Sequence, residues 1–178
     1  MLIRRVVTGH DAEGQSVFID DNLAPRADEF QDIPGHGYAQ VWSAPSTATI
    51  SKRDLTLQRG SLIPAPGGAS VLAISFPPDS VMASPINPER AFAEMAEHLP
   101  GLIDCFETDN PGMHSTPTVD YGVLLTGELW LELDNGAERK ISPGDVVIQN
   151  GTRHAWRNKT DQPARMIFVM LGIKTDSD

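Results

Sequence analysis

The sequence predicts an all-β fold, a single sandwich or small barrel, and three observations support this. Short apolar stretches alternate with Gly, Pro and Asn turn signals along most of the chain. The pattern is most regular over residues 118–172, where six strand candidates follow one another at short spacing. The 178 residues suffice for one domain with a sizeable core but are short for two.

Residues 1–76 are expected to form an N-terminal β extension. Its β-rich pieces are short and are separated by turn signals, which is typical of strands. These pieces cover residues 2–7, 15–19, 38–42 and 61–76.

Residues 77–109 change in character and are expected to form a helical insertion with a connection. Asn87 is a suitable N-cap and Pro88 suits the first helical position, which predicts a helix from there to Leu99. Pro100-Gly101 ends it. Three- and four-residue spacing predicts a packed face made of Phe92, Met95, Ala96 and Leu99.

Residues 110–172 are expected to form the core of the fold. The strand candidates cover residues 118–125, 128–134, 137–141, 145–149, 154–158 and 164–172. Asp134-Asn135-Gly136 predicts a hairpin turn with positive φ at both central residues. The strand expected over residues 118–125 is largely apolar on both of its faces. We therefore expect the N-terminal strands, a second subunit or both to cover the outer face of the barrel.

Two motifs in this core resemble those of the cupin superfamily. The first cupin motif has two histidines two residues apart, then a carboxylate, then a glycine seven residues after it; the second is Gly-x-x-His-x-x-x-Asn. The matching residues are His114, Asp120, Gly127, Gly151, His154 and Asn158. The resemblance covers about residues 110–172. It implies a cupin, jelly-roll-like double-stranded β-barrel within a single domain over residues 1–178.

The chain departs from the cupin motif at two positions. Thr116 stands where the second histidine is usual, and Asp120 replaces the usual glutamate. The resemblance then implies a metal site of His114, Asp120 and His154, with Asp120 also as a catalytic group. Two histidines and one carboxylate suit Fe(II), and Mn, Ni or Zn would equally bind these donors. Alternatively, Asp120 orients a histidine, and a lone histidine in a strand is often only structural.

A substrate pocket is expected next to this site. His154, Trp156 and Asn158 share one face of their strand, so Trp156 would form an aromatic wall if His154 points inward. We expect Thr116 and Gln149 to line the pocket as well.

Other side chains are expected to lie away from the chemistry. His36, in a Pro-Gly-His-Gly loop, could fold over the barrel mouth and supply a missing ligand. His98 ends the predicted helix, which favours an electrostatic role there. We expect His10 to be exposed, Tyr121 to pack in the core and Cys105 to be inert.

Composition bears on partners and location. The formal net charge of −10 argues against binding to nucleic acid or to anionic lipid, which both require clustered Lys and Arg. No segment has the length of a signal peptide or a membrane helix, and Cys105 is the single cysteine, so we expect a cytoplasmic protein. The cupin resemblance and the two-sided apolar strands together suggest a homodimer.

The predicted function is that of a metal-dependent enzyme that acts on a small organic molecule, and aromatic molecules are among the candidates. Oxygenation, isomerisation, decarboxylation and lyase cleavage all stay open. The alternative is a non-catalytic small-molecule binding barrel whose metal site is degraded at Thr116. A regulatory sensor ranks last because the chain has no helix-turn-helix pattern.

Overall fold

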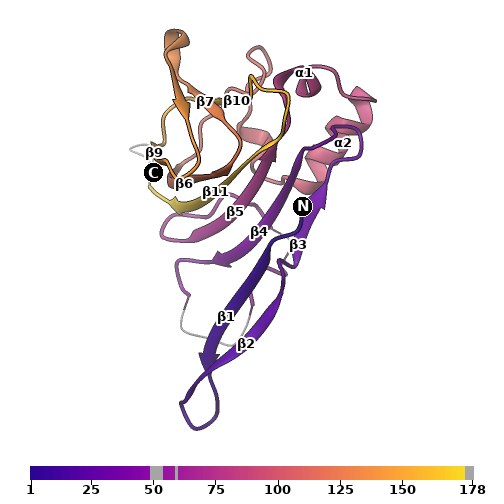
Figure 1. Cartoon of the computed structure of the whole chain (residues 1–178). Helices are drawn as coiled ribbons and strands as arrows, with labels where there is room; N and C mark the ends of the chain where they lie inside the picture. Colours follow the sequence, from indigo (N-terminus) through magenta and orange to yellow (C-terminus); the bar gives the residue numbers. More distant parts are fainter. Residues whose placement is uncertain (49–53, 59, 175–178) are drawn as a thin grey trace.

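A computed structural model describes residues 1–48, 54–58 and 60–174. It is mainly β-structure, which confirms the predicted all-β cupin barrel. The strands form a two-stranded sheet, a three-stranded sheet and a six-stranded sheet, each antiparallel. Figure 1 shows the barrel at one end of the molecule and the hairpin of the first two strands projecting from the other.

The elements follow in chain order. They are β1 (Arg4–His10), β2 (Ser16–Leu23), β3 (Arg26–Glu29), β4 (Gly37–Ala44), β5 (Ala69–Phe76), α1 (Asp79–Met82), α2 (Pro88–His98), η1 (Ile103–Cys105), β6 (Thr118–Thr126), β7 (Leu129–Glu132), η2 (Asp134–Gly136), β8 (Glu138–Ile141), β9 (Val146–Asn150), β10 (Ala155–Arg157) and β11 (Ala164–Gly172).

The six-stranded sheet has the order β3-β4-β5-β11-β6-β9. It joins strands of the predicted extension directly to strands of the predicted core, because β5 pairs with β11 along its whole length. Residues 1–76 are therefore not a separate layer laid over the barrel, as the sequence suggested. The chain start and the end of the β1–β2 hairpin cover part of this sheet: Met1, Ile3 and Ala24 pack on Ala39 and Ala73.

The barrel forms where the sheet β10-β7-β8 packs on the six-stranded sheet. Leu129 of β7 joins Leu124, Met166 and Leu72 of the larger sheet in one core, and all four are at most 1% exposed. Gly127 makes the turn into β7 at φ +80°. A Cβ atom there would lie 2.7 Å from Ala164, so this motif position requires glycine for both conformation and space.

Helix α2 begins and ends where the sequence predicts, and it packs through part of the predicted face. The Oδ1 of Asn87 accepts a hydrogen bond from the Arg90 amide, as an N-cap does. Met95 and Leu99 contact the core as predicted, whereas Phe92 and Ala96 are exposed.

The N-terminal end of α2 is attached to the 31–32 loop. Arg90 forms a two-bond ion pair with Asp32 there.

Two smaller predictions had different outcomes. The 134–136 turn is confirmed, with φ 58° at Asn135 and 69° at Gly136. Tyr121 is not a core residue: it lies on the outer side of β6 and is 43% exposed. No helix of the described residues is long and apolar enough to cross a bilayer.

Candidate functional site

A small cavity lies inside the barrel, between the two packed sheets. It encloses about 50 Å³. Its wall is mostly apolar and aromatic, and its polar side chains come from β6, β10 and the residues just before them. The lining residues are Leu72, Ile74, Phe76, Leu102, Phe106, His114, Thr116, Asp120, His154, Trp156, Phe168 and Met170.

His114 and His154 meet at this cavity through their backbones. Each donates its amide hydrogen to the other's carbonyl at 2.9 Å, which forms a short antiparallel bridge. Their ring centroids are 4.2 Å apart. The two motifs are thus brought together although they are distant in sequence, and the structure places both imidazoles on one wall.

The backbone fixes the tautomer of both rings. The Nδ1 of His114 lies 3.1 Å from the Gly112 carbonyl, and that of His154 lies 2.9 Å from the Thr152 carbonyl. A carbonyl only accepts hydrogen bonds, so each Nδ1 carries the hydrogen and each Nε2 keeps a free lone pair. This is the arrangement in which imidazole binds a metal ion or accepts a proton.

Burial keeps both imidazoles neutral. It lowers the pKa of His114, and it lowers the pKa of His154 to about 4, with the neighbouring His114 adding to this second shift. Both rings are therefore uncharged at neutral pH and can act as ligands or bases.

Asp120 supplies the carboxyl group on the cavity wall. It is 5% exposed, and its Oδ1 has no hydrogen-bond partner among the described residues. Burial raises its pKa to about 6, while the neighbouring Thr118 hydroxyl acts in the opposite direction. An unpaired buried carboxyl oxygen is costly, which indicates a position where a ligand or substrate donor binds.

The model of the Cupin domain family matches residues 107–170, which include His114, Asp120 and His154. The Phomopsin biosynthesis cluster protein C' of Diaporthe leptostromiformis is 34% identical over 176 residues, which are 96% of this chain and 78% of that protein. The chain belongs to the cupin superfamily.

Two further proteins that are similar to this chain have names that contain the word cupin. The Cupin-domain-containing oxidoreductase srdB of Neurospora crassa is 31% identical, over 96% of this cupin and 74% of that protein. A Cupin 2 conserved barrel domain protein from Salinispora arenicola CNS-205 has a solved structure that is 16% identical, with a TM-score of 0.39 over 80% of this chain and 81% of that one.

The predicted three-donor metal site is only partly assembled. Within residues 1–48, 54–58 and 60–174, no three His, Cys, Asp or Glu side chains are grouped closely enough to hold a metal ion. His114 and His154 are paired, and Asp120 is the one acid that lines their cavity in the described chain. The donor types fit a metal, with the two Nε2 atoms as its nitrogen ligands.

Thr116 and Trp156 line the cavity, where the sequence places them. The hydroxyl of Thr116 lies 2.7 Å from that of Thr118, so the residue at the missing histidine position is held within the wall. Trp156 contacts the edge of His154, with ring centroids 5.8 Å apart, and lies against Phe168 at 5.5 Å.

Gln149 and Asn158 lie outside the cavity wall, unlike the sequence-based expectation. The Gln149 amide is bonded to Thr152 through both its nitrogen and its oxygen. Asn158 donates to the carbonyls of Phe76 and Gln162 and accepts from Thr160, so its side chain is fully used in holding the turn after β10.

His36, the histidine of the Pro-Gly-His-Gly loop, does not lie at the barrel cavity, where the sequence suggested it as a further ligand. His36 is buried, stacks on Phe30 at 4.4 Å and lies with its Nδ1 2.9 Å from the Ser75 carbonyl. It does not line the barrel cavity and supplies no third nitrogen ligand there.

The sequence does not indicate two residues of the connection that line the cavity. Phe106, just after η1, contacts His114 with ring centroids 4.5 Å apart and the rings tilted by 31°, and Leu102 also lies on the wall. Nothing in the sequence of this connection indicates that it contributes to the cavity. Phe168 and Met170 could have been found, because period-2 alternation along residues 164–172 places them on one face.

Proposed function

We propose that this cupin is an enzyme that acts on a small, uncharged, largely apolar molecule held in the barrel cavity. One observation carries the proposal: two neutral imidazoles with free Nε2 atoms share a small apolar cavity with Asp120, whose Oδ1 has no partner among the described residues. Isolated polar groups in an apolar cavity are costly for stability and are typical of a catalytic or binding site.

The cavity wall favours a neutral aromatic or aliphatic substrate. Phe76, Phe106, Trp156 and Phe168 contribute ring surfaces, and no lysine or arginine of the described chain lines the cavity. A carboxylate or phosphate group of a substrate would find no cation to offset its desolvation there. Stacking on the aromatic rings would orient a planar molecule beside the two histidines.

A divalent metal ion is the cofactor that the donor types support. His114 and His154 would hold it through their Nε2 atoms, and Asp120 would be the third donor or a proton carrier beside it. Fe, Mn, Ni and Zn all bind this donor set; the ion would act as a Lewis acid or, for a redox metal, carry electrons.

The chain's own residues supply proton transfer. With a pKa of about 6, Asp120 can donate a proton below neutral pH and accept one above it. A histidine not engaged by metal can accept a proton at Nε2 while its Nδ1–H stays bonded to the backbone. Phe106 and Leu102 line the same cavity, and their apolar side chains would limit the access of bulk water to this exchange.

The names of the relatives favour oxidation over the other reaction classes. srdB of Neurospora crassa and fogC of Aspergillus ruber are both named cupin-domain-containing oxidoreductases. Among oxygenation, isomerisation, decarboxylation and lyase cleavage, oxygenation or another oxidation is therefore our first choice for this cupin.

A non-catalytic binding barrel is the second candidate. It is favoured by Thr116 at the usual histidine position and by the missing three-donor cluster in the described residues. Such a protein would bind a neutral ligand and release it chemically unchanged.

The test is a comparison of turnover with binding. The purified protein, loaded with Fe(II), Mn, Ni or Zn in turn, is incubated in air with an organic extract of the organism that encodes it. Mass spectrometry then follows every compound. We expect a neutral apolar compound to disappear and a product to form with the parent, and neither to happen with Asp120→Asn or His154→Ala. A compound that copurifies with the parent and is recovered unchanged would instead establish the binding barrel.

A further inference from the structure

A second cavity lies on the inner side of the six-stranded sheet, where β3 forms the edge of the sheet and α2 ends. Its volume is about 600 Å³, against about 50 Å³ for the barrel cavity, and no described residue lines both. We call it the edge cavity, and its volume is typical of a ligand site. Its charged and titratable lining residues are Arg26, Asp28, Tyr38, Glu97 and His98.

Two cross-strand pairs form the base of the edge cavity. Arg26 and Asp28 lie two residues apart on β3, so their side chains share one face of the strand. Arg26 pairs with Gln40 of β4, and Asp28 pairs with Tyr38. Both β4 side chains are 2% exposed. Burial and Asp28 raise the pKa of the Tyr38 hydroxyl, whereas Arg26 lowers it, so both charged groups act on this one hydroxyl.

The guanidinium of Arg26 is oriented by the chain, but one of its edges is left without an acid. Its Nη1 donates to the Gln40 Oε1 and to the Gly60 carbonyl, both at 2.9 Å. The edge formed by Nε and Nη2 pairs with no carboxylate of the described chain. In Arg90 and Arg153 the same edge binds a carboxylate through both nitrogens. The Arg26 edge therefore has the geometry that binds a carboxylate in two places.

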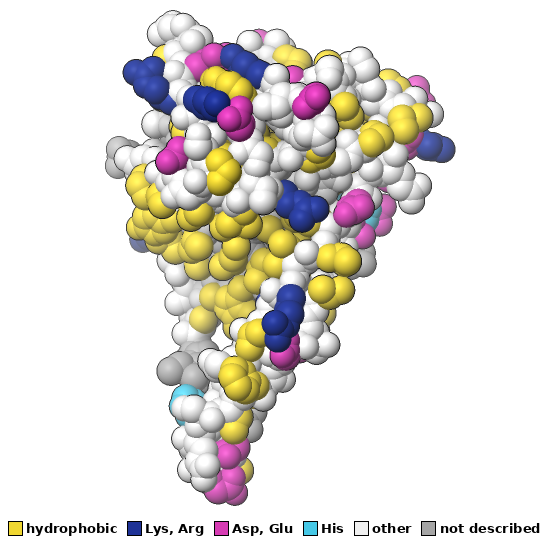
Figure 2. All heavy atoms as spheres, in the orientation of Figure 1, with side chains coloured by type: hydrophobic (Ala, Val, Ile, Leu, Met, Phe, Trp, Pro, Cys, Tyr) yellow, Lys and Arg dark blue, Asp and Glu magenta, His cyan; other side chains and the backbone are white. Residues whose placement is uncertain are grey.

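Acidic groups lie beside this guanidinium. The Oδ2 of Asp28 accepts a hydrogen bond from the Tyr38 hydroxyl at 3.3 Å and lies 3.2 Å from the Nδ1 of His98. Its Oδ1 has no hydrogen-bond partner within the described residues, and the side chain is 46% exposed. Glu97 lines the same cavity. Figure 2 shows Asp, Glu and His side chains together on the side where β3 and α2 end in Figure 1.

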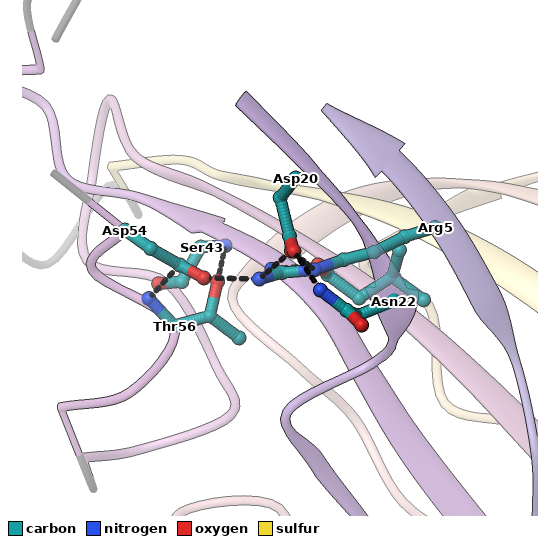
Figure 3. Close-up of polar contacts among 7 residues, drawn as sticks. Arg5, Asp20, Asn22, Ser43, Asp54 and Thr56 are labelled. Atoms are coloured by element: carbon teal, nitrogen blue, oxygen red, sulfur yellow. Dashed lines mark hydrogen bonds and ion pairs between the residues drawn. The ribbon is translucent and has the colours of Figure 1, made fainter. Parts of the chain in front are cut away.

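Another part of the wall is fixed to the body of the protein (Figure 3). Thr56 lines the edge cavity and is 1% exposed. Its hydroxyl accepts a hydrogen bond from the Ser43 amide at 3.1 Å, and its own amide donates to Asp54 at 2.9 Å. Asp54 is in turn held by Arg5. Leu57 follows Thr56 on this wall and exposes an apolar side chain.

We propose that the edge cavity binds a free α-amino acid, with its carboxylate on the Nε–Nη2 edge of Arg26 and its ammonium group beside Asp28 and Glu97. A simple anion would be repelled by the two acids and by the net charge of −10. A simple cation would leave the Arg26 edge unpaired. A zwitterion pairs with both kinds of group, and Leu57 and Pro100 offer surface to an apolar side chain.

The test is calorimetric titration of the purified full chain with leucine, methionine and phenylalanine. For each amino acid, the analogues that lack the amino group or the carboxyl group are titrated as well. We expect at least one of the three amino acids to bind, one per chain. Its two analogues should bind at least about tenfold more weakly, because each loses one charge-assisted contact.

Variants of the edge cavity test the contacts. Arg26→Gln and Asp28→Asn should each weaken binding at least about tenfold, and Glu97→Gln about threefold. Arg139→Gln is the matched control, because Arg139 is an exposed arginine on β8 outside the cavity. Circular dichroism verifies folding. Since Arg26→Gln also loses two internal hydrogen bonds, the other two variants keep the test decisive if it does not fold.

The double variant His114→Ala/His154→Ala separates this site from the barrel site, because an amino acid can also chelate a metal ion. We expect it to bind the amino acid as the parent does, whatever its metal content. Loss of binding in this variant would place the ligand in the barrel and overturn the proposal. So would the absence of binding by all three amino acids, or parent-like affinity in the folded edge-cavity variants.

Discussion

The buried carboxyl group of Asp120 makes the stability of the protein depend on pH. Its pKa of about 6 in the folded chain lies above its ordinary value of 3.8, so the folded state holds the proton more tightly than the unfolded state. The stabilisation from this protonation is complete below the ordinary value and is lost as pH rises toward 6.

Asp120→Asn should remove this loss. Each pKa unit corresponds to about 1.4 kcal/mol, so the variant should gain about 3 kcal/mol of unfolding free energy relative to the parent between pH 4 and pH 7. Urea unfolding across that range measures the gain, with Asp161→Asn, an exposed carboxyl, as the control. Parallel pH profiles for the parent and Asp120→Asn would contradict the burial of this charge.

Asn158 is the motif residue whose role the structure changes. Its side chain bonds to Phe76, Gln162 and Thr160, so Asn158→Ala should cost about 2–4 kcal/mol through lost and unsatisfied hydrogen bonds. Thermal and urea unfolding measure this cost. Metal content should be unchanged, because the side chain does not line the cavity. A variant that is as stable as the parent but loses metal would show that Asn158 belongs to the metal site.

At the scale of elements, the connection from Leu99 to Met113 contributes Leu102 and Phe106 to the cavity wall. An ion pair between Glu107 and Arg153, with an Oε1–Nε distance of 2.5 Å, attaches it to the barrel. The cavity of about 50 Å³ is too small for an aromatic ring, so we expect an aromatic ligand to enter only if Phe106 moves.

Phe106→Ala should therefore open the cavity. We expect a neutral probe such as indole to bind the variant at least about tenfold more tightly than the parent, at a stability cost of about 1–3 kcal/mol for the partly buried ring. Fluorescence or calorimetric titration measures the binding. Phe92→Ala, on the exposed side of α2, is the control. Equal indole affinity for the parent and Phe106→Ala would show that this ring does not gate the cavity.

The elements show what the sequence could and could not predict. Strand alternation, the Asn87 cap and the 134–136 turn are local signals, so the strands, the helix and the hairpin were predictable. The packed face of α2 was predictable only in part, because Met95 and Leu99 contact the core but Phe92 does not. The motifs predicted that His114 and His154 lie together. They did not predict the contact of Phe106 with His114, because Phe106 lies outside both motifs.

At the scale of the whole molecule, net charge and apolar surface act in opposite directions. Each copy carries a formal charge of −10, so two copies of the homodimer that the sequence predicts repel at low ionic strength, while exposed apolar side chains such as Ile148 and Val146 would attract. The dissociation constant of that predicted dimer should therefore fall several-fold between about 50 and about 500 mM NaCl. Sedimentation at both salt concentrations tests this, and a dimer that weakens with salt would indicate a charge-based interface instead.

The proposed enzyme needs the two paired imidazoles of His114 and His154 as the ligands of its metal ion. The most direct test is metal analysis of protein purified without chelator or a metal-binding tag, beside His114→Ala, His154→Ala and the exposed control His10→Ala. We predict near-stoichiometric metal in the parent and in His10→Ala, and its loss in the other two variants. No metal in any of them, even after reconstitution with Fe(II), Mn, Ni or Zn, would contradict the metal-dependent enzyme.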